Sequence, residues 1–291
     1  MVLGRLILRR INIIGLIILI IAALLALYSF IKFKSTSDNE APVITGADEQ
    51  LEVSVEDDES IFLEGVSATD DKDGDVTDTM VVEKLSDFNE DYERIVTLAA
   101  FDSSGGVSTA KRKIKYTDYR QPHFSIKEPL IFTASTTDFL ENIEADDCLD
   151  GDITSNISFS SKYEVTTDVA GDYDMELQVV NSAGDVAYLP VTITISNDDV
   201  VPLIYLEDYV VYVSKNGEID YEDLITSVSY SGMDYDVSES GVGDYNIGYS
   251  EFTIDDSEVN LSKVGNYVAI YKLSIDNSKK GIARLNVVVE D

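Results

Sequence analysis

The hydrophobic residues of this 291-residue chain follow two different patterns. From Ile13 to Ile31, 19 consecutive residues carry no charge and are mostly Ile, Leu or Ala. A run of that length spans a bilayer as a helix. After residue 40, apolar and polar residues alternate, as at Met175, Leu177 and Val179, and no stretch keeps a helical period. Alternation of this kind predicts half-buried strands, so we expect an all-β chain behind one N-terminal transmembrane helix.

Charges around the apolar run predict its orientation. Three Arg precede the run and two Lys follow it, and the positive-inside rule then places the N-terminus in the cytoplasm. We expect a cytoplasmic segment at 1–11, a signal-anchor helix at 12–32 and a linker at 33–40. A cleaved secretory signal is the alternative, although residues 28–33 offer no small-x-small cleavage site. In both cases the remaining chain lies outside the cytoplasm, and in the first it is a single-pass membrane protein.

Two sequence landmarks recur along the exported part. Prolines at Pro42, Pro122 and Pro202 are spaced 80 residues apart, and each follows an Asp by four positions. The pattern Asp-x-x-Asp-Gly-Asp-(Val/Ile)-Thr occurs at Asp70–Thr77 and again at Asp147–Thr154. A regular repeat of strands and turns is typical of tandem sandwiches.

A third landmark is a polar turn near the end of each repeat. The three turns lie at Phe101–Val107, Val180–Val186 and Ile275–Ile282, between alternating apolar segments. We therefore expect three β-sandwich domains, at 41–118, 119–197 and 198–291.

These motifs resemble the bacterial surface immunoglobulin-like repeats first described in insecticidal crystal proteins, and the related hyalin-type repeats. The match runs through Gly65–Thr77 in the first repeat and Asn142–Thr154 in the second. The third repeat keeps only Pro202, Gly265–Tyr267 and the last turn, so it is either a divergent copy or a different sandwich. The resemblance implies tandem immunoglobulin-like β-sandwiches on a bacterial surface of the Gram-positive type, serving as a spacer or adhesion module.

Charge narrows the possible partners. The chain has a net charge of −34, which repels nucleic acid and attracts cations. Carboxylates on a glycine-kinked loop can ligate Ca²⁺, whereas the alternative is that each Asp only caps a turn. The calcium candidates are Asp70, Asp73, Asp75, Asp147, Asp150 and Asp152.

Little in the composition supports catalysis. The chain has one His, His123, and one Cys, Cys148, so we expect no enzyme activity. The third repeat holds ten of the 17 Tyr; Tyr favours recognition surfaces but is also a common strand residue. The candidate binding residues are Tyr209, Tyr212, Tyr230, Tyr235, Tyr245 and Tyr249.

Three functions remain open at this point. The first is a membrane-anchored adhesion or interaction protein with an extracellular protein or glycan partner. The second is a structural subunit of a cell-envelope assembly. The third is a hydrolase of wall polymers that would use an acidic pair in the third repeat.

Overall fold

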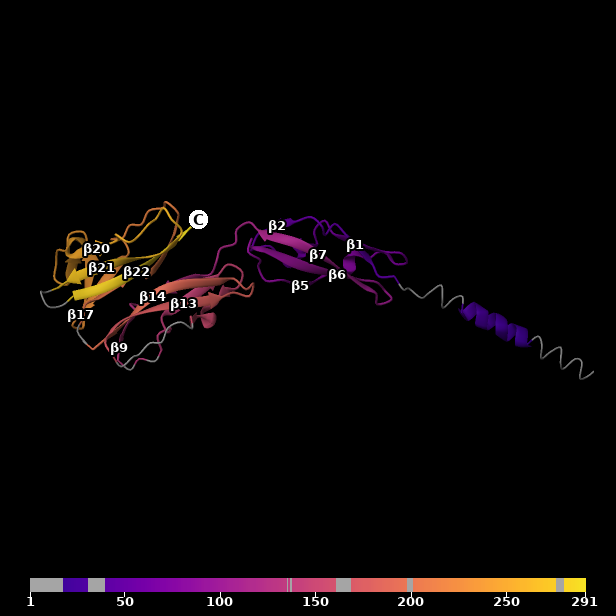
Figure 1. Cartoon of the computed structure of the whole chain (residues 1–291), viewed down its shortest axis with the longest axis horizontal. Helices are drawn as coiled ribbons and strands as arrows, with labels where there is room; N and C mark the ends of the chain where they lie inside the picture. The colour runs from indigo at the N-terminus through magenta and orange to yellow at the C-terminus, as the bar shows by residue number, and fades with distance from the viewer. Residues whose placement is uncertain are drawn as a thin grey trace, which may run out of the picture. The chain divides into compact units, whose positions relative to one another are not determined.

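The computed structural model describes residues 18–30, 40–134, 136, 138–160, 169–197, 201–275 and 280–291. Contacts divide the chain into two compact units, Met1–Thr117 and Asp118–Asp291. One sandwich folds in the first unit and two fold in the second (Figure 1). The prediction of tandem β-sandwiches is therefore confirmed, while the predicted domain bounds stay predictions.

Residues 18–30 form a helix whose side chains are exposed. Within the described residues, no helix combines the length and the apolar character needed to cross a membrane. The predicted anchor at 12–32 begins and ends outside the described residues. The predicted cytoplasmic segment at 1–11 lies wholly outside them, as does all but the last residue of the 33–40 linker.

The first sandwich has a three-stranded and a four-stranded sheet. The smaller sheet has the order β1 (Val43–Thr45), β3 (Ser67–Asp70), β4 (Gly74–Asp75). The larger has the order β2 (Leu51–Val53), β7 (Val107–Tyr116), β6 (Glu93–Phe101), β5 (Val81–Leu85). Inward-facing residues such as Val96, Leu98 and Ile114 are fully buried between the sheets, as their alternation predicts.

The second sandwich repeats this arrangement. Its smaller sheet has the order β8 (His123–Ile126), β10 (Ile143–Asp147), β11 (Gly151–Asp152). Its larger sheet has the order β9 (Ile131–Thr133), β14 (Val186–Ser196), β13 (Gly171–Val180), β12 (Ser158–Phe159).

The third sandwich has the same strand order with one strand added. One sheet has the order β15 (Leu203–Leu206), β17 (Ile225–Tyr230), β18 (Met233–Ser238), β19 (Asn246–Gly248). The other has the order β16 (Val210–Ser214), β22 (Lys280–Glu290), β21 (Gly265–Ser274), β20 (Phe252–Asp255). Strand β19, which pairs in parallel with β18, lies within residues 229–257, a stretch that reads as an insertion relative to the first two repeats. The third repeat is thus a divergent copy rather than a different sandwich.

One parallel pairing recurs in all three copies. The strands β2, β9 and β16 each lie parallel to the last strand of their own sandwich, β7, β14 and β22. The chain segment just before each of them lies in the opposite sheet. A first segment split between two sheets, beside antiparallel neighbours, gives the immunoglobulin-like arrangement of two packed sheets.

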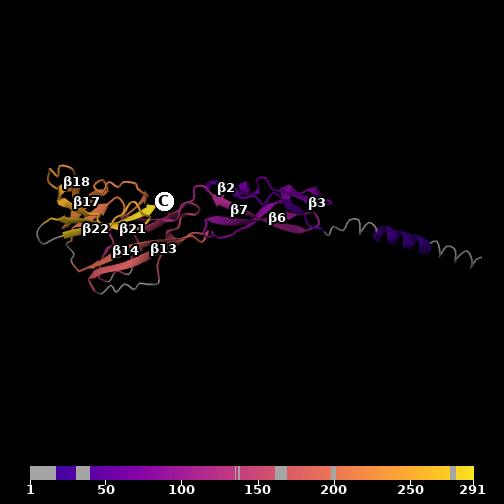
Figure 2. The ribbon, with the colours of Figure 1, turned by 45° about the horizontal axis from the view of Figure 1, so that its top comes forward.

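The second and third sandwiches share one continuous core. Buried residues such as Ile126 and Ile195 of the second belong to the same cluster as Ile204 and Leu285 of the third. Strand β22 contacts β14, and β16 contacts β8, so the two sandwiches lie side by side within this unit (Figure 2). The third sandwich therefore docks onto the second instead of only following it along the chain.

Candidate functional site

The first Asp-Gly-Asp loop is fastened to the turn that follows β6. Asp73 accepts two hydrogen bonds from Ser103, one from the backbone N–H at 2.6 Å and one from the hydroxyl at 2.9 Å. Ser103 lies in the turn between β6 and β7, 30 residues along the chain. The recurring loop and the recurring turn are therefore two halves of one contact.

The second sandwich contains the same contact between loop and turn, which we call the latch. Asp150 accepts from the backbone N–H of Ser182 at 2.5 Å and from its hydroxyl at 2.6 Å. Gly74 and Gly151 have φ values of 76° and 71°, a backbone region that glycine enters without steric cost. The Gly between the two Asp residues of each motif allows the turn, and the preceding Asp closes the latch.

The other loop carboxylates cap the backbone. In the first loop, Asp70 Oδ1 accepts from the N–H groups of Lys72 and Asp73, both at 2.9 Å, and Asp75 accepts from the N–H of Thr77 at 3.0 Å. The second loop has equivalent bonds at its own positions, with Asp147 and Asp152 as the acceptors.

All six calcium candidates thus accept backbone N–H groups, as the turn interpretation predicts. Among the residues that the structure describes, no group of three Asp, Glu, His or Cys side chains has the arrangement of a metal site. Calcium binding at the six residues stays a prediction.

Cys148 lies beside the entry to the second sandwich. Its Sγ donates to the backbone carbonyl of Arg120 at 3.2 Å. Burial raises the pKa of this thiol, more than the neighbouring Arg120 N–H and guanidinium lower it. A thiol that stays protonated is a weak nucleophile.

Two of the candidate tyrosines lie in the contact between the second and third sandwiches. The ring of Tyr212 stacks on His123, with centroids 3.6 Å apart and planes 11° from parallel, and its hydroxyl accepts from the backbone N–H of Phe124 at 2.6 Å. Tyr209 is only 3% exposed and donates its hydroxyl to the carbonyl of Ile204 at 2.7 Å. These two residues hold the sandwiches together and are not available to an outside partner.

Asp208 is the polar centre of that contact. Its Oδ1 accepts from the backbone N–H groups of Ile126 at 3.0 Å and Val210 at 2.9 Å. Its Oδ2 accepts from the hydroxyl of Ser125 at 2.5 Å and from the ammonium of Lys127 at 2.9 Å. One carboxylate of the third sandwich thus ties down three consecutive residues of the second.

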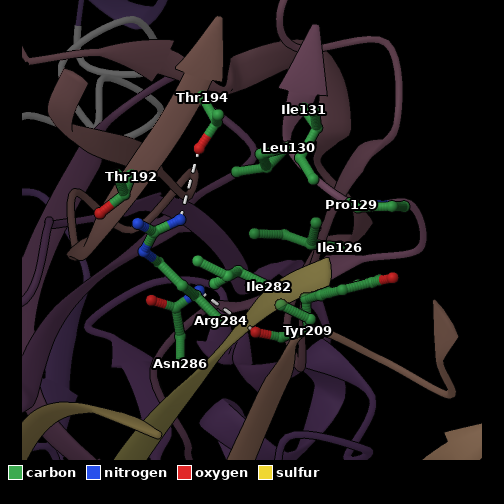
Figure 3. Close-up of a pocket in the computed structure, with 11 residues that line it drawn as sticks. Ile126, Pro129, Leu130, Ile131, Thr192, Thr194, Tyr209, Ile282, Arg284 and Asn286 are labelled. Atoms are coloured by element: carbon green, nitrogen blue, oxygen red, sulfur yellow. Dashed lines mark hydrogen bonds between the residues drawn. The ribbon is translucent and has the colours of Figure 1, made fainter. Parts of the chain in front are cut away.

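Arg284 crosses the same contact from β22 to β14 and β13. Figure 3 shows its bond to Thr194 of β14. Arg284 donates to the hydroxyl of Thr194 at 3.3 Å and to the carboxylate of Asp172 at 2.5 Å. The enclosed space beside it has a volume of only about 30 Å³, whereas pockets for organic ligands are typically ~300 Å³ or more. We therefore interpret this contact as a structural joint.

A larger hollow opens in the third sandwich beside the added strand. Its volume is about 300 Å³, and it lies between β18, β19 and the end of β21. Tyr235 contributes an aromatic ring to its wall, and the polar residues there are Ser240, Asn246, Ser250, Glu251 and Ser274. The wall also has apolar side chains, so it combines apolar surface with a few hydrogen-bonding groups, as small-ligand pockets do.

Gly241 allows the chain to form the wall of this hollow. Gly241 has φ 57°, and a Cβ there would lie 2.6 Å from the backbone nitrogen of Gly248. Only a residue without a side chain permits that approach. Tyr245, 57% exposed, leans on Tyr235 with ring centroids 5.8 Å apart.

The six candidate tyrosines therefore separate into three pairs. Tyr209 and Tyr212 lie in the contact between sandwiches. Tyr235 lines the hollow and Tyr245 packs on its ring. Tyr230 and Tyr249 are half-buried in the third sandwich. Sequence analysis missed the polar wall residues of the hollow, because short side chains in loops have no distinguishing pattern. The one available signal was the insertion-like stretch at residues 229–257 of the third repeat.

A second, wider hollow in the third sandwich is acidic. It has a volume of about 610 Å³. Its wall includes the carboxylates of Glu218, Asp220, Glu222 and Asp256 together with the ring of Tyr221.

Comparison with known proteins gives no family. No family model matches, and no curated protein matches. Among solved structures, a chain with the CBM51-2 and INT domains of ZmpB from Clostridium perfringens, in complex with GlcNAc, is 18% identical, with a TM-score of 0.22. The match covers 51% of this chain and 26% of that one.

Two further matches are similarly distant. The M60 catalytic domain with CBM51-1 and CBM51-2 from the same protein is 12% identical over 88% of this chain and 31% of its own, with a TM-score of 0.23. Mouse cadherin-23 EC22-24 is 12% identical over 87% of this chain and 100% of its own, with a TM-score of 0.18. The chain thus spans about a quarter to a third of the length of the clostridial chains. TM-scores this low support no inference about function. The strand order itself shows what this chain is, a tandem of immunoglobulin-like β-sandwiches.

Proposed function

We propose that this chain is a non-catalytic bacterial surface protein, anchored by residues 12–32, whose third sandwich binds a glycan. The predicted domains at 41–118, 119–197 and 198–291 then form an acidic extracellular stalk. The apolar run of 19 residues and the flanking charges support the anchor. The hollow beside Tyr235 is the observation that carries the binding function.

The chemistry of the hollow suits a neutral sugar. A pyranose ring offers C–H groups that pack on an aromatic face and hydroxyls that need both donors and acceptors. Tyr235 supplies the ring, Asn246 an amide, and Glu251 a carboxylate acceptor. A volume of about 300 Å³ lies at the lower end of the range of small-molecule sites.

The joint between the second and third sandwiches supports this function by fixing the orientation of the hollow. Asp208 and Arg284 each bond across it, and apolar residues of both sandwiches fill it. A rigid mount lowers the entropy that binding must overcome.

The test of binding is a glycan array probed with the detergent-solubilised full chain. The probes are oligosaccharides of neutral and N-acetylated hexoses. Saturable binding to a defined subset supports the proposal, whereas signal on no probe, or equal signal on all of them, contradicts it.

The test of location uses intact cells that express the chain. Protease added outside should cut the sandwiches, and mass spectrometry of the membrane fraction should recover peptides from residues 1–11. A mature terminus near residue 35 would contradict the anchor.

A further inference from the structure

Two carboxylates at one end of the first sandwich have an oxygen without a partner. Asp70 is 8% exposed and Asp102 is 9% exposed. The Oδ1 atoms of both accept backbone N–H groups. The Oδ2 atoms of both are buried and have no hydrogen-bond partner among the described residues. Burying an acceptor with no donor is costly, so this arrangement needs an explanation.

The second sandwich shows how the same two positions are normally joined. Asn181 stands where the first sandwich has Asp102, because its Oδ1 likewise accepts from the N–H groups two and four residues on. Its Nδ2 donates to Oδ2 of Asp147, the counterpart of Asp70, at 3.1 Å. In the first sandwich an acceptor replaces this donor, so no such bond can form.

The second sandwich also has a positive charge near Asp147, the guanidinium of Arg120. Arg120 forms an ion pair with Asp146, and the charges of Asp146 and Asp147 help to raise the pKa of its guanidinium against the effect of burial. Counted from the repeat prolines, the equivalent residue of the first sandwich is Glu40. The first sandwich thus has acids at both positions where the second has an amide and a guanidinium.

The turn after β6 holds the Asp102 side chain in place. Its Oδ1 accepts from the N–H groups of Ser104 and Gly106, both at 2.7 Å, and from the Ser104 hydroxyl at 2.9 Å. Its Oδ2 lies 2.1 Å from the position of a Cβ on Gly106, so the glycine leaves room for that oxygen. In the second sandwich, Asp185 stands at the position of Gly106.

We propose that the first sandwich binds a divalent cation of the Ca²⁺ type between Asp70 and Asp102, and that the second sandwich does not. Hard cations take carboxylate oxygens as ligands, and a cation here would supply the charge that Arg120 supplies in the second copy. Two carboxylates are fewer ligands than Ca²⁺ takes, so water and backbone carbonyls complete the shell. The site differs from the six-residue prediction, because Asp102 lies outside the Asp-Gly-Asp motif.

The experiment is calcium titration of the detergent-solubilised full chain by calorimetry, in ~150 mM KCl to screen the acidic surface. We expect saturation at about one Ca²⁺ per chain, since one sandwich has the site. Asp102→Asn should abolish this binding, because the amide restores the bond seen between Asn181 and Asp147. Circular dichroism checks that this variant is folded, and Asn181 shows that an amide fits the position.

The matched control is Asp150→Asn, which removes a carboxylate from the loop of the second sandwich. It should keep the single site with unchanged affinity. No saturable binding by the unmodified chain would overturn the proposal, as would two sites per chain or undiminished binding by Asp102→Asn. Loss of binding in Asp150→Asn would place the site in the wrong sandwich and would overturn it as well.

Discussion

His123 stacks face to face on Tyr212 with ring centroids 3.6 Å apart. The next residue, Phe124, donates its N–H to the hydroxyl of the same tyrosine, 88 residues further along the chain. His123 also meets Glu290 at 2.9 Å. The first strand of the second sandwich is therefore in contact with both a strand near the start and the last strand of the third. These contacts of β8 help to join the second and third sandwiches into one compact unit.

The first prediction concerns the hydroxyl of Tyr212. Tyr212→Phe removes the acceptor of the Phe124 N–H and leaves that donor without a partner inside the contact. We expect a loss of about 1–3 kcal/mol in the free energy of unfolding, measured by urea denaturation. Tyr188→Phe, at an exposed position of β14, should change it by less than ~0.5 kcal/mol. Equal stability of both variants would contradict the role given to Tyr212.

The second prediction concerns the latch of the second sandwich. Asp150→Asn exchanges an oxygen acceptor for a donor opposite Ser182 and removes the charge from both bonds. Stability should fall by about 1–3 kcal/mol, and by the same amount in calcium and in chelator. A deficit that appears only when calcium is present would show that Asp150 is a metal ligand.

The third prediction concerns acid. The backbone N–H of Thr154, followed by its hydroxyl, lowers the pKa of Asp152 below the usual value. A carboxylate with a lowered pKa in the folded state stabilises the fold above the unfolded pKa of about 4 and ceases to do so as the pH falls below it.

Asp152→Asn keeps an acceptor for Thr154 but cannot titrate. The melting temperature of this variant should therefore fall less between pH 7 and pH 3 than that of the unmodified chain. Glu141→Gln, at an exposed position, is the control. An unchanged acid response in Asp152→Asn would exclude this carboxylate from the acid sensitivity.

The fourth prediction concerns Cys148. Because burial raises the pKa of its thiol, the folded chain should react with a thiol reagent at least ~10-fold more slowly than the unfolded chain. The rate is followed at pH 8 with and without urea. A fast reaction of the folded chain would indicate an accessible thiol.

Short-range patterns made much of the fold predictable. The prolines spaced 80 residues apart and the alternating segments indicated three sandwiches, because successive side chains of a half-buried strand face the core and the solvent in turn. The Asp-Gly-Asp loops were recognised too. The partner of each loop was not, since Asp73 meets Ser103 only after the two sheets have packed.

Contacts between distant segments limited the prediction of the site. Tyr209 and Tyr212 were grouped with the other tyrosines on composition, yet His123 and Ile126 of another sandwich cover them. The difference between Asp102 and Asn181 was visible in the aligned turns. The consequence of this difference depends on the carboxylate that faces each side chain, Asp70 or Asp147, and only the folded structure identifies it.

The measurement that tests the central claim most directly is glycan binding by Tyr235→Ala, compared with Tyr188→Ala, on the array probes that the unmodified full chain binds. If the hollow in the third sandwich is the binding site, removing its ring should weaken binding roughly tenfold or more, while the control binds as before. Equal binding by both variants would contradict the account.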